Sequence, residues 1–152
     1  MSESMPTNTD LARRLFDEVF NARNTEVLDE IVAVGYTEHA LAPFESDEPG
    51  AVDGPAHMRG VIEWLVEQYP DLHMDVVAAV SDRDLIAVRV VSEGTNTGKL
   101  NGFLPPTGRR FCAEQSHWYR VDSGRRVEHW AGRDDLRTMQ QLGLVPGPTP
   151  VQ

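Results

Sequence analysis

Two histidines in the C-terminal third of the chain, His117 and His129, are the side chains best suited to catalysis. Histidine is the natural acid/base group near neutral pH, and a pocket of low polarity can shift its pKa in either direction. A neutral imidazole takes a proton from a substrate, and the protonated ring can return it. The two rings can work together only where the chain brings them to one wall of a cavity.

The segments that carry the two histidines, 110–121 and 126–133, read as a β-hairpin. They flank Asp122-Ser123-Gly124, which favours a tight antiparallel turn. We expect the face with few charges to meet the helices and the face with three charges to meet solvent or another subunit, although a slip of one residue would exchange them. The first face holds Gln115, His117, Tyr119, Val121, Val127, His129 and Ala131, with His117 opposite Ala131 and Tyr119 opposite His129; the second holds Glu114, Ser116, Trp118, Arg120, Glu128 and Trp130.

Asp134 is the candidate carboxylate to act with these histidines. Its alternative role is to cap the helix that follows it, where Asp135 adds a favourable charge at the helix start. The histidines also have an alternative role, as hydrogen-bonded residues of the core or of a sheet edge. Several polar groups gathered inside one small core favour a functional site.

No other motif predicts a metal, a nucleophile or a phosphate loop. No third ligand has the spacing to complete a metal site with the two histidines of the hairpin. His57 and His73 are predicted to be exposed or half-buried without a partner. Cys112, the single cysteine, is predicted to be a small core or interface residue. The glycines between 94 and 108 match no phosphate-binding motif. We therefore expect no metal and no cofactor.

Helices first and strands afterwards predict an α+β domain in two layers. Apolar residues at helical spacing predict helices over 11–20, capped by Thr9 or Asp10, and over 27–32, from which Tyr36–His39 leads away. The other expected elements are a loop at 42–55, a helix at 55–69 ended by Pro70, strands at 72–80 and 85–93, a long connection at 94–106, the hairpin, and a last helix that ends at Gly143.

Composition limits the class of partner. The chain has 152 residues and a net charge of −10, so nucleic acid and anionic membranes would be repelled. It lacks an apolar run of about 20 residues and a signal-peptide pattern, so we expect a cytoplasmic protein. The expected organisation is a flexible N-terminus at 1–9, one domain at 10–145, and an extended Pro-rich tail at 146–152.

The order of several short motifs resembles that of the SnoaL-like polyketide cyclases, in the nuclear-transport-factor-2-like superfamily. These motifs are LFDEVFNARNTEVLDEIVAVGYTEH, YPDLHMDV, GTNTG, LPPTGRRF, RVDSGRRVEHW and DDLRTMQQLG. The resemblance covers about residues 10–143. It implies a cone-shaped barrel, in which a curved antiparallel sheet packs on N-terminal helices and a short C-terminal helix follows, with a deep pocket inside. It also implies a homodimer or higher homo-oligomer.

The resemblance implies ring closure by intramolecular aldol condensation without metal or cofactor, with an aspartate as general acid/base and an assisting histidine. The histidine position corresponds to His117, whereas the aspartate position holds Ala131. In the segment that is usually GTH, Asn96 replaces the histidine. The expected catalytic residues are His117, His129 and Asp134, and the expected substrate-binding residues are Tyr36, His39, Trp64, Asn96, Phe103 and Tyr119.

Three functions are consistent with these residues. The first is a cofactor-free enzyme acting on a polyketide-like or other cyclic substrate, by aldol cyclisation or a related hydroxylation. The second is a non-catalytic binding protein that kept the pocket and lost the base, as Ala131 and Asn96 suggest. The third is an epoxide hydrolase, for which Arg89 lacks a clear pair of carboxylates.

Overall fold

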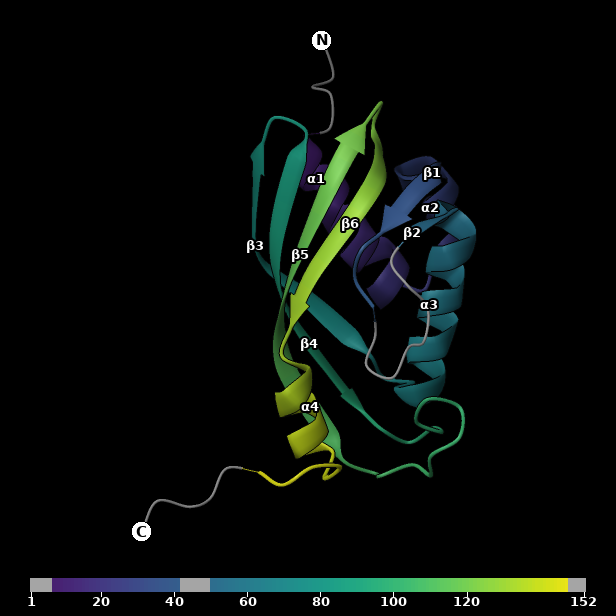
Figure 1. Ribbon diagram of the computed structural model, residues 1–152, viewed down its shortest axis with the longest axis vertical. Coiled ribbons are helices and arrows are strands. Elements are labelled where there is room, and N and C mark those ends of the chain that lie inside the picture. The colour runs from purple at the N-terminus through teal and green to yellow at the C-terminus, as the bar shows by residue number, and fades with distance from the viewer. Residues whose placement is uncertain (1–6, 42–49, 148–152) are drawn as a thin grey trace.

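The computed structural model describes residues 7–41 and 50–147. Short helical segments come first in the chain, and two strands, a long helix, four further strands and a short C-terminal helix follow (Figure 1). The helical elements are α1 (Asn8–Arg14), the π-helix η1 (Leu15–Asn21), the 3₁₀-helix η2 (Thr25–Val27), α2 (Leu28–Ile31), α3 (Gly54–Gln68) and α4 (Asp135–Gln141). The strands are β1 (Val32–Glu38), β2 (Gly50–Asp53), β3 (His73–Asp82), β4 (Leu85–Thr95), β5 (Arg110–Asp122) and β6 (Arg125–Arg133).

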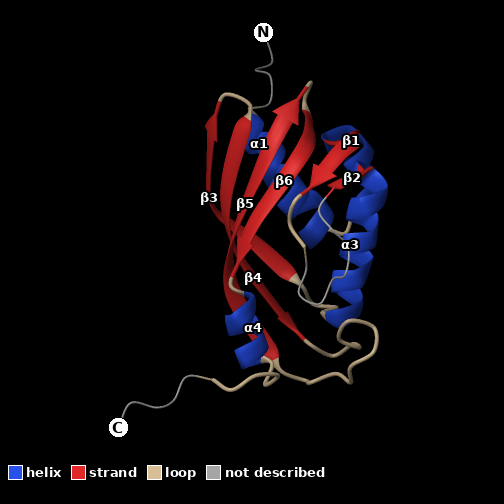
Figure 2. Cartoon of the chain, viewed as in Figure 1, coloured by secondary structure: helices blue, strands red, loops and turns tan. Residues whose placement is uncertain are grey.

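The six strands form one curved sheet in the order β2-β1-β6-β5-β4-β3 (Figure 2). Neighbouring strands are antiparallel except β1 and β6, which run parallel. Within the described residues the edge strands β2 and β3 do not pair with each other, so the sheet stays open. The predicted α+β architecture is confirmed, and the cone is an open one whose sheet contains one parallel pair.

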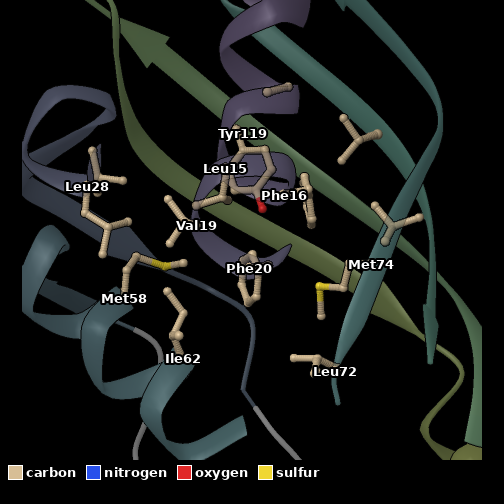
Figure 3. Close-up of a cluster of buried hydrophobic side chains, with 14 of the residues drawn as sticks. Leu15, Phe16, Val19, Phe20, Leu28, Met58, Ile62, Leu72, Met74 and Tyr119 are labelled. Atoms are coloured by element: carbon tan, nitrogen blue, oxygen red, sulfur yellow. The ribbon is translucent and has the colours of Figure 1, made fainter. Parts of the chain in front are cut away.

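The core lies between one face of this sheet and the helices α1, η1 and α3. Aromatic and aliphatic side chains from η1, among them Leu15, Phe16 and Phe20, pack against Met58 and Ile62 of α3 (Figure 3). Burial of such side chains stabilises the fold by about 1.5–3 kcal/mol each. The core is continuous with a cavity that is bordered by α3, the inner face of the sheet, α4 and the loop at 98–108.

The predicted register of the hairpin is confirmed. His117 pairs with Ala131 and Tyr119 with His129, and the face that carries these pairs is turned to the helices. The register shifts by one residue between Arg120 and Val121, a β-bulge. This bulge changes the predicted face beyond it, because Arg126 rather than Val127 is turned inward and completely buried.

Several predicted boundaries differ from the structure. The first helix begins at Asn8 and is capped by Thr7, whose hydroxyl accepts from the backbone N–H of Asp10 in a capping box. Residues 32–38 form a strand where the sequence predicted the end of a helix and an exit segment. Of the predicted loop at 42–55, residues 42–49 lie outside the described residues, and Gly50–Asp53 is an edge strand paired with β1. The predicted termini 1–9 and 146–152 are described only at 7–9 and 146–147.

The last helix begins and ends where the sequence predicted. The Asp134 side chain caps α4 by accepting from the backbone N–H of Arg137. Gly143 follows the helix with a positive φ of 77°, which favours glycine. None of the helices within the described residues is long and apolar enough to cross a membrane.

Candidate active site

A cavity of about 590 Å³ lies between the inner face of the sheet, α3 and α4. Its wall is mainly apolar, and a few polar side chains converge on it from different elements. This combination is typical of a small-molecule site. The apolar side chains include Phe20, Met58, Trp64, Leu65, Leu72, Met74, Leu100 and Phe111, and the polar ones include Glu38, His57, Gln115, His117, Tyr119 and His129. Figure 3 shows Phe20, Met58, Leu72, Met74 and Tyr119 around this interior.

Four of the polar side chains form one hydrogen-bonded chain. Glu38 Oε1 is 2.7 Å from His129 Nδ1, and His129 Nε2 is 2.9 Å from His117 Nδ1. The far nitrogen of His117, Nε2, is 2.9 Å from Gln115 Oε1. The two imidazole rings are nearly parallel, with centroids 5.2 Å apart. We call Glu38, His129 and His117 the relay.

The carboxylate of the relay also has a second histidine partner. His57 Nε2, on α3, is 3.0 Å from Glu38 Oε2, and the backbone N–H of Ala40 donates to Oε1 at 2.9 Å. Glu38 therefore connects two histidine groups that line one cavity from opposite elements, the sheet and α3. Its position follows from the parallel pairing of β1 with β6, which sets Glu38 beside His129.

Hydrogen bonding holds Glu38 in the charged form. Burial alone would raise the pKa of this carboxyl, but the hydrogen bonds from His129 and His57 outweigh it and lower the pKa from 4.5 to about 2. For His117 the balance is opposite. Burial, with smaller contributions from His129 and Arg133, lowers the pKa of His117 well below its usual 6.5, so this ring is neutral at pH 7.

The relay has two consistent proton arrangements. With both rings neutral, His129 Nδ1–H donates to Glu38 and His117 Nδ1–H donates to His129. The lone pair of His117 Nε2 then accepts from the Gln115 side chain, whose amide is turned to present an N–H group in this state. With one proton added at His117 Nε2, the Nδ1 proton moves to His129, and His117 Nε2–H donates to Gln115 Oε1. The positive charge of this second state lies on His129, in contact with the Glu38 carboxylate. His117 can therefore accept a proton without keeping the charge.

Five of the residues predicted for the site line the cavity. His117, His129 and Tyr119 contribute from the hairpin, Trp64 from α3, and Phe103 from the loop at the cavity rim, where its side chain is 70% exposed. Tyr119 stacks on His129 with ring centroids 4.8 Å apart. These side chains were predicted from one hairpin face and from the family resemblance, and the structure brings them together.

The other four predicted residues lie elsewhere. His39 stacks on Trp130 at 4.9 Å and binds Glu128 at 2.7 Å, on the outer side of the sheet. Tyr36 is buried beneath the cavity. Asn96 holds its loop by bonds to Gln68, Gly98 and Thr107. Asp134 caps α4, and its neighbour Asp135 is the one that lines the cavity.

Sequence reasoning missed Glu38 and His57. His57 was predicted to lack a partner, and the structure shows that this prediction was wrong, since the ring binds Glu38. Strand alternation was the available signal for Glu38, because the residue two positions before it, Tyr36, also points inward. Residues 36–39 were predicted only to lead away from a helix, so the alternation of a strand was not recognised there.

No three metal-ligating side chains gather into a site that could hold a metal ion anywhere in 7–41 and 50–147. The arrangement of a carboxylate and two stacked histidines is able to remove a proton from a substrate carbon and to hold the resulting charge.

Fold and site together define a small α+β protein with an internal cavity that histidines and a carboxylate line. The family model described as SnoaL-like polyketide cyclase matches residues 10–142. The chain belongs to this family, as the resemblance predicted.

The chain is similar in sequence to named cyclases and in fold to a solved structure of the same kind. The chain is 30% identical over 147 residues to aklanonic acid methyl ester cyclase DnrD of Streptomyces peucetius, which covers 96% of this chain and 97% of the relative. It is 28% identical over 125 residues to nogalonic acid methyl ester cyclase of Streptomyces nogalater, covering 82% and 89%. Among solved structures, wild-type IdmH of Streptomyces antibioticus matches with a TM-score of 0.73 and 32% identity, covering 88% of this chain and 96% of IdmH.

The charge on Glu38 makes stability depend on pH in a defined direction. Because the pKa of Glu38 is lower in the folded protein than its usual 4.5, the carboxylate stabilises the fold above that pH, and the contribution is lost as pH falls toward 2. We expect Glu38→Gln to lower the free energy of unfolding at pH 7 by roughly 2–3 kcal/mol. This deficit should shrink as the pH falls below 4.5.

Urea unfolding at a series of pH values measures this effect. The matched control is Glu67→Gln, an exposed carboxyl on α3, whose curve should run parallel to that of the unmodified protein. A Glu38→Gln variant whose deficit is the same at pH 7 and at low pH would contradict the assigned charge.

Proposed function

We propose that the chain is a cofactor-free cyclase that closes a ring in a polyketide methyl ester by intramolecular aldol condensation. The observation that carries this proposal is the relay, in which a buried carboxylate backs two histidines on one wall of an apolar cavity. The relatives named as methyl ester cyclases support the substrate class. Aldol closure is an isomerisation, so it needs a base and an acid and no redox partner.

In the first step His117 Nε2 removes a proton from a carbon that lies next to a carbonyl group. The electron pair of the broken C–H bond moves into the enolate, and the positive charge passes to His129 beside Glu38. The substrate enters between His117 and Gln115, whose amide is the present partner of Nε2. General base catalysis of this kind contributes about 10²–10⁴-fold.

In the second step the enolate carbon attacks a carbonyl carbon of the same molecule. A C–C bond forms, the π-electron pair of that carbonyl moves to its oxygen, and the resulting alkoxide takes up a proton. His57 is the proposed donor, because it lines the cavity from α3 and shares the Glu38 carboxylate with the relay. After the product leaves, the relay releases the proton taken at His117 to solvent and His57 takes one from solvent. The number of protons is unchanged and the starting state is restored.

Ala131 motivates a second candidate, a non-catalytic binding protein on the same fold. Ala131 is the cross-strand partner of His117, where the family resemblance places the catalytic aspartate. The proposed enzyme differs in supplying the carboxylate from β1 instead, through Glu38 and His129. The two candidates differ in whether a bound polyketide ester is turned over.

Replacement of His117 tests the enzyme. With aklanonic acid methyl ester as substrate, we expect His117→Ala to lower kcat about 100-fold or more, because the group that takes the proton is lost. His73→Ala is the matched control, since His73 is exposed and pairs only with Asp75 within the described residues. Equal turnover by the His117→Ala variant and the unmodified protein would exclude the assigned base. Binding of the ester without turnover by the unmodified protein would favour the binding protein.

A transplanted carboxylate tests the role of Glu38. Ala131→Asp places an acid opposite His117, so in a Glu38→Gln background it should restore part of the lost kcat, on the order of tenfold. Ala131→Asn, which has a similar size and no charge, should restore nothing. Equal kcat values for the Asp and Asn variants would show that the relay does not depend on a carboxylate charge.

We also propose a homodimer or larger homo-oligomer formed through the outer face of the sheet, in the cytoplasm. Trp118, 42% exposed, lies on that face opposite Trp130, with Arg120 above the Trp130 ring at 5.8 Å. Light scattering should give at least twice the chain mass of 17.0 kDa, and Trp118→Glu should reduce that mass. A single-chain mass for the unmodified protein would contradict the proposed oligomer.

The proposed location is tested separately by cell fractionation, and recovery of the protein in a periplasmic fraction would contradict it.

A further inference from the structure

Arg126 of β6 is a buried cation without an acidic partner. Its side chain has no exposed surface, and no carboxylate of the described residues forms an ion pair with it. One nitrogen, Nη2, donates to the main-chain carbonyls of Leu11 at 2.7 Å and Ala12 at 3.0 Å. The other two, Nε and Nη1, have no hydrogen-bond partner among the described residues. A buried charge is costly unless another group interacts with it.

The local backbone explains how the guanidinium is held. The β-bulge of the hairpin turns Arg126 inward, and its two carbonyl partners lie one turn before Leu15, where α1 gives way to the π-helix η1. A carbonyl oxygen has two lone pairs, so each of these acceptors can bind the guanidinium as well as a helical N–H group. These contacts hold the group in place without neutralising its charge.

The charge also interacts with an aromatic ring. The guanidinium carbon of Arg126 lies 4.8 Å from the ring centroid of Tyr119, a cation–π distance. Tyr119 also stacks on His129, at 4.8 Å and 14°. The phenol therefore joins the buried cation to the relay.

The hydroxyl of Tyr119 is free to bind a ligand. Tyr119 lines the cavity, and no hydrogen bond within the described residues engages its oxygen. Figure 3 shows the ring reaching from the sheet with its oxygen directed into the surrounding apolar side chains. A phenol placed in this way is a hydrogen-bond donor in a site of low polarity, where such donors are most effective.

We propose that Tyr119 and Arg126 form an oxyanion site: the Tyr119 hydroxyl donates to the enolate oxygen, and the Arg126 charge behind its ring strengthens this donor. The inference rests on the proposed function, because the relay generates the enolate. Tyr119 is the catalytic residue of the pair. Arg126, which does not line the cavity, is a positioning residue that acts through Tyr119.

The charges around the phenol are consistent with this assignment. Burial raises the pKa of Tyr119, and the Arg126 cation acts in the opposite direction, while Glu38 raises the pKa further. Removal of the cation should therefore make the phenol a weaker acid and a weaker donor. The ionisable groups that face Tyr119 or its neighbours are Tyr36 and Glu38 of β1, His57 of α3, His117 of β5, Arg126, His129 and Arg133 of β6, and Asp135 of α4.

A titration that needs no substrate tests the electrostatic part. With 3-fluorotyrosine at position 119, ¹⁹F NMR follows ionisation of the phenol as the pH rises. We expect Arg126→Met and Arg126→Gln to raise the midpoint by about one pH unit or more. The amide of Gln can keep the contacts with Leu11 and Ala12, so this variant guards against a failure to fold. Arg125→Met, a neighbouring exposed arginine, should leave the midpoint unchanged. An unchanged midpoint in a folded Arg126→Gln variant would overturn the proposal.

A double-mutant cycle tests whether Arg126 acts through Tyr119. We expect Tyr119→Phe to lower kcat about 100-fold, the effect of removing one oxyanion donor. Arg126→Gln should lower kcat by itself but have no further effect in the Tyr119→Phe background. Equal effects of Arg126→Gln in both backgrounds would indicate a structural role alone and overturn the proposal. If aklanonic acid methyl ester is not turned over at all, the proposed function fails, while the ¹⁹F titration still decides the Arg126–Tyr119 coupling.

Discussion

The buried carboxylate of Glu38 is the group on which the rest of the site depends. It carries a charge into an interior made largely of Phe, Leu, Met and Val, where an uncompensated carboxylate would take up a proton. Hydrogen bonds from His129 of the sheet and His57 of α3 keep it ionised. The same contacts fix both rings in orientation, so one charge sets the geometry on two walls of the cavity. The proposed base depends on that charge, because His117 alone is too deeply buried to hold a proton.

The fold was largely predictable from sequence because its signals are local. The turn at Ser123–Gly124 and the alternation on either side of it gave the register that brings His117, His129 and Tyr119 to one face. The helix at 54–68 and the cap at Asp134 also follow from local patterns. The predicted start of the first helix differs from the observed one because the capping residue, Thr7, was not distinguished from its polar neighbours. The strand Gly50–Asp53 was not predicted because pairing with β1 stabilises a segment of low intrinsic strand preference.

The site was predictable only in part, because its key contact is not local. Glu38 and His129 are separated by 91 positions, and no pattern in either strand reports that β1 runs parallel to β6. Asp134 was the predicted carboxylate partner because it closely follows the histidines in sequence, but its side chain caps the N-terminus of α4. Val127 was predicted to face inward because simple alternation was continued through the strand, whereas a one-residue bulge turns Arg126 inward instead. Bulges and parallel pairing depend on tertiary packing and therefore lie beyond a reading of each strand alone.

The division of the relay between distant strands has a consequence for folding. The β5–β6 hairpin is formed by neighbouring residues and can assemble early, whereas docking of β1 requires closure of a long stretch of chain, which is slow. A molecule with only the hairpin in place has both histidines and lacks their carboxylate. The proposed relay is therefore complete only when β1 has docked against β6, so the activity proposed for it requires the first half of the polypeptide to have joined the second.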